Sequence, residues 1–147
     1  FGITAIVSIG LIIAGWRMSD FIPVYDPPTW GRNVTFLLLL FAFLCLGIFL
    51  FRGSLRQRLR SPLSIGVVLW GVGHLFANGD RASLILFSGM IMYGLTHLVI
   101  AARSGYRPSP EVRNGHDVLS VLAGATLYGL MIQLHDVIIG VPALQLI

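Results

Sequence analysis

Three histidines lie inside long apolar stretches of this 147-residue chain: His74, His97 and His135. A titratable side chain at bilayer depth is energetically costly, and where one occurs it commonly serves as a ligand, a proton relay or part of a cofactor site. These histidines are nearly the only titratable groups within the apolar stretches. Any chemistry that this chain carries out inside a membrane is therefore expected to use them.

The composition indicates an integral membrane protein. Hydrophobic residues make up 56% of the chain and charged residues only 11%, whereas a soluble domain is about one quarter charged. The net charge of +4 comes from arginine alone, in short stretches between apolar runs. That pattern is typical of topology signals, so we expect a lipid bilayer as partner and no nucleic acid. The single cysteine, Cys45, excludes a disulfide framework and a thiolate metal site.

Five apolar runs determine the predicted architecture. A spanning helix needs roughly 20 apolar residues, or about 17 at the short end. The runs are Phe1–Trp16, Val34–Phe51, Leu63–Ala77, Ala82–Ala102 and Val118–Leu134, the last continuing through His135 and Asp136 to Val141. The sequence thus predicts an all-α polytopic transmembrane helix bundle, a single domain over residues 1–147 with five spans. Because the chain opens inside an apolar run, we also expect a sixth span to be missing before Phe1.

The arginines between the runs predict the orientation. Loops 52–60 and 103–117 carry seven arginines, and they share a side because two spans separate them. The opposite side carries three, namely Arg17, Arg32 and Arg81. Since arginine is enriched on the cytoplasmic side, we expect loops 52–60 and 103–117 in the cytoplasm. The aromatic and proline-rich stretch 25–30 then lies at the outer interface.

Helical rise predicts the depth of each histidine. His74 precedes Asp80 by six residues, or about 9 Å, and His135 precedes Pro142 by about 10 Å on the same side. His97 lies about 9 Å from the opposite boundary, at Arg103. His74 and His135 are therefore expected to meet in one layer that His97 does not reach.

The neighbours of His74 and His135 favour a cofactor between them. Trp70 and Gly73 share the His74 side of one helix, and Tyr128 and Met131 share the His135 side of another. Two facing imidazoles suit bis-histidine ligation of haem iron, and a chlorin magnesium or a non-haem metal are alternatives. The predicted metal ligands are His74 and His135, and the predicted cofactor-binding residues are Trp70, Gly73, Tyr128 and Met131. The other possibility for both histidines is a packed side chain bonded to a neighbouring helix, which is also the interpretation that we favour for His97.

Other polar and small residues are given structural roles. Gly79 is expected to end one helix and Asp80 to cap the next, and His116 to be a solvated or capping residue. The cluster of Arg56, Arg58 and Arg60 is expected to lie against anionic lipid headgroups. Small residues spaced by four predict helix contacts at Gly10 and Ala14, Gly73 and Ala77, and Ser120 and Gly124.

Three stretches together resemble the NnrU family of integral membrane proteins: VYDPPTWGR at 24–32, LWGVGHLFANGD at 69–80 and LHDVIIGVP at 134–142. The resemblance implies a bacterial inner-membrane protein associated with denitrification through nitrite and nitric oxide reductase function. It also implies a distant similarity to 15-cis-zeta-carotene isomerase, which is described as a haem b enzyme with histidine ligation. His74 and His135 match histidines of the family pattern. This chain has Arg60-Ser61-Pro62 where family members commonly carry Arg-His-Pro, and the resemblance implies an earlier helix that we expect to be missing before Phe1.

Three functions of different classes follow as expectations. The first is an accessory protein of nitrogen-oxide metabolism that binds haem b. The second is a structural subunit of a larger membrane complex, which is compatible with the first. The third is a haem-dependent carotenoid cis-trans isomerase. Whether the chain is an enzyme stays open at this point.

Overall fold

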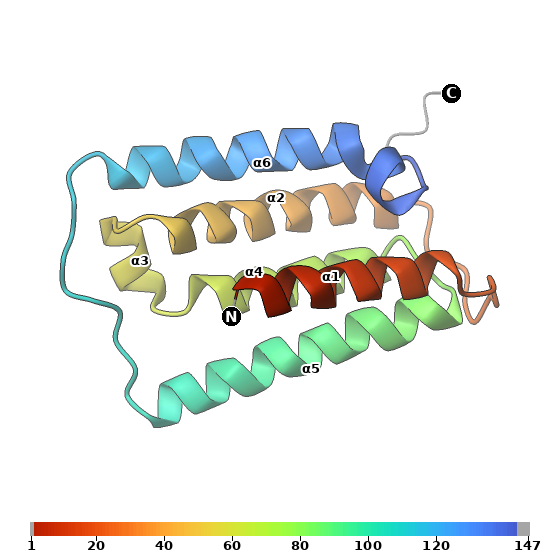
Figure 1. Ribbon diagram of the computed structural model, residues 1–147, viewed down its shortest axis with the longest axis horizontal. Coiled ribbons are helices and arrows are strands. Elements are labelled where there is room, and N and C mark those ends of the chain that lie inside the picture. The colour runs from red at the N-terminus through yellow and green to blue at the C-terminus, as the bar shows by residue number, and fades with distance from the viewer. Residues whose placement is uncertain (1, 144–147) are drawn as a thin grey trace.

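The computed structural model describes residues 2–143, which form six α-helices (Figure 1). They are α1 (Gly2–Arg17), α2 (Gly31–Leu50), α3 (Ser54–Leu59), α4 (Pro62–Leu75), α5 (Arg81–Arg103) and α6 (His116–Ile139). The all-helical class is confirmed for these residues. Each of the five apolar runs forms one helix, with bounds that differ by a few residues. The expected span before Phe1 lies outside the described residues.

Three helices, α2, α5 and α6, are long and apolar enough to cross a membrane. α1 and α4 are equally apolar but shorter, with 16 and 14 residues. α4 begins at Pro62, which is suited to a first helical position, and ends at Leu75 before a tight turn over 76–80. That turn removes the last two residues of the predicted run from the helix.

Four helices lie side by side in the order α6, α2, α4, α5 (Figure 1). α1 crosses in front of α4 and contacts the other helices near its C-terminal end. There the Trp16 indole N–H donates to the Ser83 hydroxyl at 3.1 Å, and the Arg17 guanidinium donates to the Ile138 carbonyl at 3.1 Å. These two bonds attach α1 to the same end of the layer at which α4 and α6 end.

Glycine allows α2 and α6 to approach closely. A Cβ atom built on Gly124 would lie 2.7 Å from the Phe43 carbonyl oxygen, and one on Gly47 would lie 2.1 Å from the Ser120 carbonyl oxygen. The predicted contact of Ser120 and Gly124 is therefore confirmed, since small residues drive helix association in lipid. By contrast, a Cβ on Gly10 would meet no atom of the described residues within 4 Å, so no contact of that kind forms there.

Few apolar side chains are buried inside the molecule. The buried apolar residues among the described ones are Ala42, Cys45, Ile48 and Phe87. Large apolar side chains on every long helix are exposed instead, including Leu37, Ile85, Met92 and Val137. Exposed apolar surface on this scale indicates a partner that is itself apolar. Together with the apolar helices, it indicates that the chain lies in a lipid bilayer.

The turn between α4 and α5 connects the layer to the loop before α2. Asp80 caps α5 as predicted, because its carboxylate accepts the Ser83 backbone N–H at 2.9 Å. Gly79 does not end α4, which stops four residues earlier. Its carbonyl accepts the backbone N–H groups of Val24 and Tyr25 at 2.8 and 3.1 Å, and a Cβ there would collide with the Tyr25 carbonyl. Gly79 thus permits a close backbone approach between two distant segments.

The arginine-rich stretch 52–60 contains the short helix α3, which the sequence pattern did not indicate. Its first turn is capped from outside the helix, because the Asp117 carboxylate accepts the Leu55 backbone N–H at 2.9 Å. The neighbouring His116 accepts the Arg52 backbone N–H at its Nδ1 atom, at 3.1 Å. His116 thus bonds to the backbone between α2 and α3 and does not cap a helix, and together with Asp117 it fixes α3 to the start of α6.

Candidate cofactor site

A cavity of about 290 Å³ lies where α4 and α6 end and α2 begins. Side chains of all three helices line it, together with residues of the turns that follow α4 and α6. Four of the sequence-predicted site residues are in this lining: His74, Tyr128, Met131 and His135. The structure therefore brings together side chains from two helices that are more than 50 positions apart in the sequence.

His74 lies in the last turn of α4. Its Nδ1 atom is 2.9 Å from the Trp70 carbonyl oxygen. A carbonyl can only accept, so Nδ1 carries the hydrogen and Nε2 keeps a free lone pair. The imidazole also stacks on Phe87 of α5, with ring centroids 4.5 Å apart and planes at 23°. The hydrogen bond and the stacking together fix both the tautomer and the orientation of the ring.

His135 lies near the end of α6 and is fixed in the same way. Its Nδ1 atom is 2.6 Å from the Val141 carbonyl oxygen, so this nitrogen also carries the hydrogen. Gly140 makes that bond possible by reversing the chain after α6 with a φ of 88°, a conformation that favours glycine. His135 therefore also keeps its lone pair on Nε2.

The other two histidines have different surroundings. His116 accepts a backbone N–H at Nδ1, so its hydrogen is on Nε2. His97 lies on α5 in the lining of a second cavity, and its Nδ1 atom is 2.8 Å from the Ser64 hydroxyl. His74 and His135 thus share a cavity that neither His97 nor His116 lines, and a tautomer that His116 does not have.

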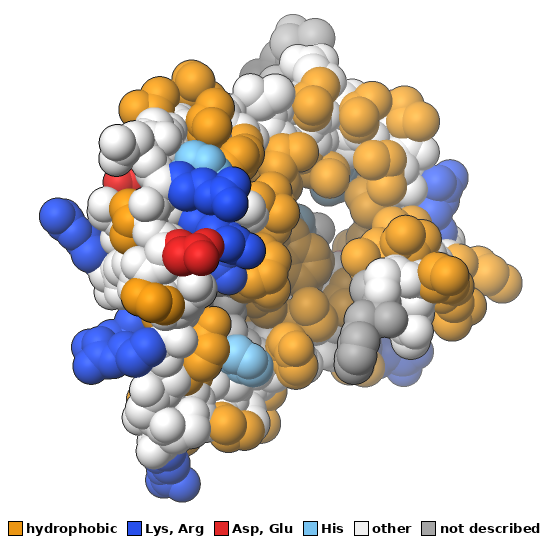
Figure 2. Space-filling model, turned by 60° about the vertical axis from the view of Figure 1, so that its left-hand side comes forward, with side chains coloured by type: hydrophobic (Ala, Val, Ile, Leu, Met, Phe, Trp, Pro, Cys, Tyr) orange, Lys and Arg blue, Asp and Glu red, His pale blue; other side chains and the backbone are white. Residues whose placement is uncertain are grey.

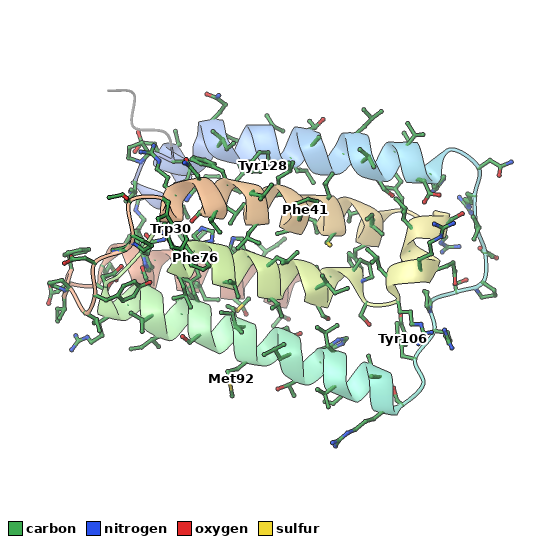
Figure 3. All side chains as sticks on the ribbon, turned by 180° about the vertical axis from the view of Figure 1, so that it is seen from behind. Trp30, Phe41, Phe76, Met92, Tyr106 and Tyr128 are labelled. Atoms are coloured by element: carbon green, nitrogen blue, oxygen red, sulfur yellow. The ribbon has the colours of Figure 1, made fainter. Side chains whose placement is uncertain are left out.

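Tyr128 and Met131 extend the His135 side of the cavity along α6. Tyr128 lies between α6 and α2 (Figure 3), where its hydroxyl donates to the Phe36 carbonyl at 3.0 Å. Its ring also contacts that of Phe43, with centroids 6.0 Å apart. Tyr128 therefore fixes the spacing of the two helices that form the cavity walls.

Trp70 and Gly73 lie outside the lining of this cavity. Trp70 packs edge-on against Phe87, with centroids 5.0 Å apart, and so faces α5. Gly73 faces α2, where a Cβ atom would lie 2.6 Å from Leu39, and its carbonyl accepts the Thr35 hydroxyl at 2.7 Å. Both residues support His74 by packing α4 against its neighbours, and neither leaves open space beside the imidazole.

Sequence reasoning missed the α2 wall of the cavity. Arg32, Thr35, Phe36 and Leu39 all contribute to the lining. Their spacing of three, four and seven residues is the signature of one helix face, so the pattern was present in the sequence. The Arg32 guanidinium donates to the Ala143 carbonyl at 3.1 Å and lies 5.9 Å from the Phe36 ring centroid. It places a fixed positive charge beside the cavity.

Tyr25 holds the turn that follows His74. Its hydroxyl donates to the Leu75 carbonyl and to the Asn78 carbonyl, the latter at 2.9 Å. Burial, and to a smaller extent the carboxylate of Asp80, raise the pKa of Tyr25 above its usual value of 10.0. The phenol is therefore a neutral donor at physiological pH.

Two imidazoles, those of His74 and His135, line the cavity. Among residues 2–143, no group of three or more His, Cys, Asp or Glu side chains is placed to hold a metal ion. A structural or catalytic metal bound by protein side chains alone needs three or four such ligands. Two histidines instead match the axial ligands of an iron whose other four ligands belong to a tetrapyrrole.

The comparisons with known proteins identify one family. No curated protein and no solved structure matches the chain. The family model described as NnrU protein matches residues 1–143, which include α1 to α6, all cavity-lining residues and both histidines. The chain therefore belongs to the NnrU family.

Proposed function

We propose that this chain is an integral membrane accessory protein of nitrogen-oxide metabolism that binds haem b through His74 and His135. Membership of the NnrU family suggests the link to denitrification. The apolar helices and the exposed apolar side chains support a site within the bilayer. We place the protein in the bacterial inner membrane, where the reductases of nitrogen oxides obtain their electrons.

One observation carries the haem proposal. His74 and His135 line the same cavity, and each donates its Nδ1–H to a backbone carbonyl. Metal-binding histidines almost always hold their second nitrogen in this way, which fixes the ring and makes Nε2 a better ligand. The same tautomer at two sites on different helices is what a pair of axial ligands requires.

The other lining residues fit a planar, largely apolar macrocycle with acidic side groups. Phe36, Leu39, Phe43 and Met131 offer apolar contacts, and Arg32 offers a charge partner for a propionate. The cavity, about 290 Å³, lies just below the range of ligand sites, which span roughly 300–1,000 Å³. A macrocycle held there is therefore expected to stay partly exposed at the cavity mouth. A haem with two histidine ligands supplies one-electron transfer rather than ligand binding at iron.

We further propose that all five long helices cross the membrane, with loops 52–60 and 103–117 in the cytoplasm. α4 measures about 21 Å by helical rise, less than the hydrocarbon thickness of roughly 30 Å. It nevertheless lies between α2 and α5, which are both long enough to span. A helix packed between two spanning helices runs through the same depth, and mismatch of this size is accommodated by local thinning.

The haem proposal is tested with purified protein from cells supplied with a haem precursor. A pyridine haemochrome assay should give about one haem b per chain, with the absorption spectrum of a six-coordinate low-spin iron. His74→Ala and His135→Ala should each abolish that spectrum. His97→Ala is the matched control, because it removes a histidine from a different cavity. Absence of haem from the wild-type protein, or equal loss in the control, would reject the proposal.

A further inference from the structure

A second cavity, of about 400 Å³, lies at the end of the layer opposite to the histidine pair. It is formed by the end of α2, by α3 with the turn that follows it, by the first half of α4, and by the last half of α5. Figure 2 shows arginine side chains gathered at this end of the molecule, and Tyr106 is seen there in Figure 3. The proposed haem site does not use this cavity.

Two arginines form the polar wall of this second cavity. Arg56 and Arg60 both line it, together with the hydroxyls of Ser61 and Ser104. The salt bridge found within residues 2–143 joins Arg52 to Glu111. Among these described residues, neither Arg56 nor Arg60 is therefore paired with a carboxylate. The Arg56 guanidinium instead lies 5.4 Å from the Phe49 ring centroid, which holds it against the cavity wall.

The backbone at Arg60 is strained in a way that places this residue at the cavity. Its φ of 61° and ψ of −56° are unusual for a residue with a side chain. The Ser61 backbone N–H donates to the Leu59 carbonyl at 2.6 Å, so Arg60 is the central residue of a tight γ-turn. Strain of this kind is concentrated at functional sites. α4 starts directly after the turn, with no side-chain cap on its N-terminus.

The rest of the wall is apolar and open to the bilayer. Tyr93 and Ile100 of α5 line the cavity and are 63% and 60% exposed. Because α5 is one of the spanning helices, their exposed surfaces face lipid. The lining also contains a polar pair, Ser64 and His97, whose side chains lie 2.8 Å apart in a hydrogen bond. The cavity therefore combines cationic, neutral hydrogen-bonding and apolar side chains.

We propose that this cavity binds one anionic phospholipid, with its phosphate between Arg56 and Arg60 and an acyl chain along α5. A guanidinium recognises phosphate through two parallel hydrogen bonds, and the uncapped start of α4 adds favourable potential for an anion. Ser64 and His97 offer hydrogen-bonding groups within the same cavity to the ester groups of such a lipid. A soluble phosphate shares the headgroup chemistry but makes no use of the apolar wall.

The test uses the full chain in detergent, with lipids added one at a time and counted by native mass spectrometry. Dioleoyl-phosphatidylglycerol should bind about tenfold more tightly than dioleoyl-phosphatidylcholine, since each arginine near the headgroup contributes to anion binding. The double variant Arg56→Gln/Arg60→Gln should lose that preference. Arg56→Lys/Arg60→Lys keeps the charge, and it should recover only part of the preference because lysine cannot bind bidentately.

The matched control is Arg58→Gln/Arg107→Gln, which removes the same charge from the same end of the molecule but from outside the cavity lining. It should change the preference less than twofold, because a bound headgroup interacts mainly with the charges that it contacts, whereas salt screens the more distant ones. An equal loss in the control variant, or equal binding of the two lipids, would overturn the proposal. Inorganic phosphate binding that depends on Arg56 and Arg60, with no lipid preference, would assign a soluble anion and also overturn it. Ala101→Trp, which fills the apolar wall, should weaken lipid binding and leave phosphate binding unchanged.

Discussion

His135 donates its Nδ1–H to the carbonyl of Val141, six residues further along the chain, at 2.6 Å. The bond crosses the end of α6 and depends on the left-handed backbone of Gly140. His135 is thus oriented by the loop that ends its own helix, whereas His74 is oriented within α4 by Trp70. The two halves of the proposed haem site therefore respond differently to changes in the backbone.

The first prediction concerns this turn. Gly140→Ala places a side chain at a φ of 88°, which costs about 1–2 kcal/mol for a residue other than glycine. If the turn relaxes, Val141 no longer accepts the Nδ1–H and the imidazole loses its fixed tautomer. Haem affinity should fall by about tenfold, which corresponds to 1.4 kcal/mol, as measured by haem titration of the purified apoprotein.

Gly129→Ala is the control for that experiment, because Gly129 is in the same helix and a Cβ there meets no atom within 4 Å. Alanine at an exposed helix position is neutral or mildly stabilising. Haem affinity should stay at the wild-type value in this variant. Unchanged affinity in Gly140→Ala as well would show that the turn does not orient His135.

A second prediction concerns the contact of α2 and α6, two of the helices that form the walls of the cavity. Gly124→Ala puts a methyl group 2.7 Å from the Phe43 carbonyl oxygen, and overpacking of this kind costs about 1–3 kcal/mol. The thermal unfolding midpoint in detergent should fall. Gly89→Ala, on α5 with open space around it, should leave the midpoint unchanged, and a similar fall in both would contradict close packing at Gly124.

The helices were predictable from the sequence to within a few residues because apolar runs without charge can hardly form anything else in lipid. α3 was not, since it has only six residues, four of them polar, and its first turn is capped by Asp117, a residue 62 positions from Leu55. Gly79 was misjudged for a related reason. Its close approach to Tyr25 depends on a segment that no local pattern identifies.

The depth of the site residues along the helices was predictable, but the side of α4 that faces the cavity was not. Helical rise gives the depth of a residue from its distance to the helix end, and His74 and His135 do line one cavity. The side of α4 that faces the cavity depends on how α4 packs against α2 and α5. Gly73 and Trp70 were predicted to line the cavity, but Gly73 packs against α2 and Trp70 packs against α5. The ligand role of either histidine stays a prediction.

A third prediction concerns topology and isolates α4. With Cys45→Ala removing the native thiol, Ser19→Cys and Ser109→Cys each introduce one exposed cysteine. Three long helices, α2, α4 and α5, and the short α3 separate these positions. If all three span, an impermeant maleimide applied to spheroplasts should label Cys at position 19 and reach position 109 only after lysis.

The opposite labelling pattern would reverse the proposed orientation and leave the number of spans unchanged. Labelling of both positions from one side would show that α4 does not cross, because two spans return the chain to the same side. The buried native Cys45 lies on α2 at 7% exposure. Its replacement by alanine is therefore checked first by haem content and by the unfolding midpoint.

A fourth prediction follows from the raised pKa of Tyr25. The folded protein binds the phenolic proton more tightly than the unfolded chain does, whose tyrosine pKa is about 10. The stability that this gives is fully present below pH 10 and is lost as the pH rises through the higher folded-state value. The free energy of unfolding of the wild type should therefore decline above about pH 10.

Tyr25→Phe should remove the contribution of the phenol to the decline in the free energy of unfolding above about pH 10. It should also lower stability at neutral pH by about 0.5–1.5 kcal/mol, because the carbonyls of Leu75 and Asn78 lose their shared donor. Asp80→Asn separates the causes: the amide can still cap α5 through its side-chain oxygen, but the carboxylate charge that adds to the shift is gone. The decline should then still begin near pH 10, but it should end at a lower pH and be smaller than in the wild type, because the folded-state pKa lies closer to the unfolded one. An identical pH profile in wild type and Tyr25→Phe would show that the phenol does not titrate with unfolding.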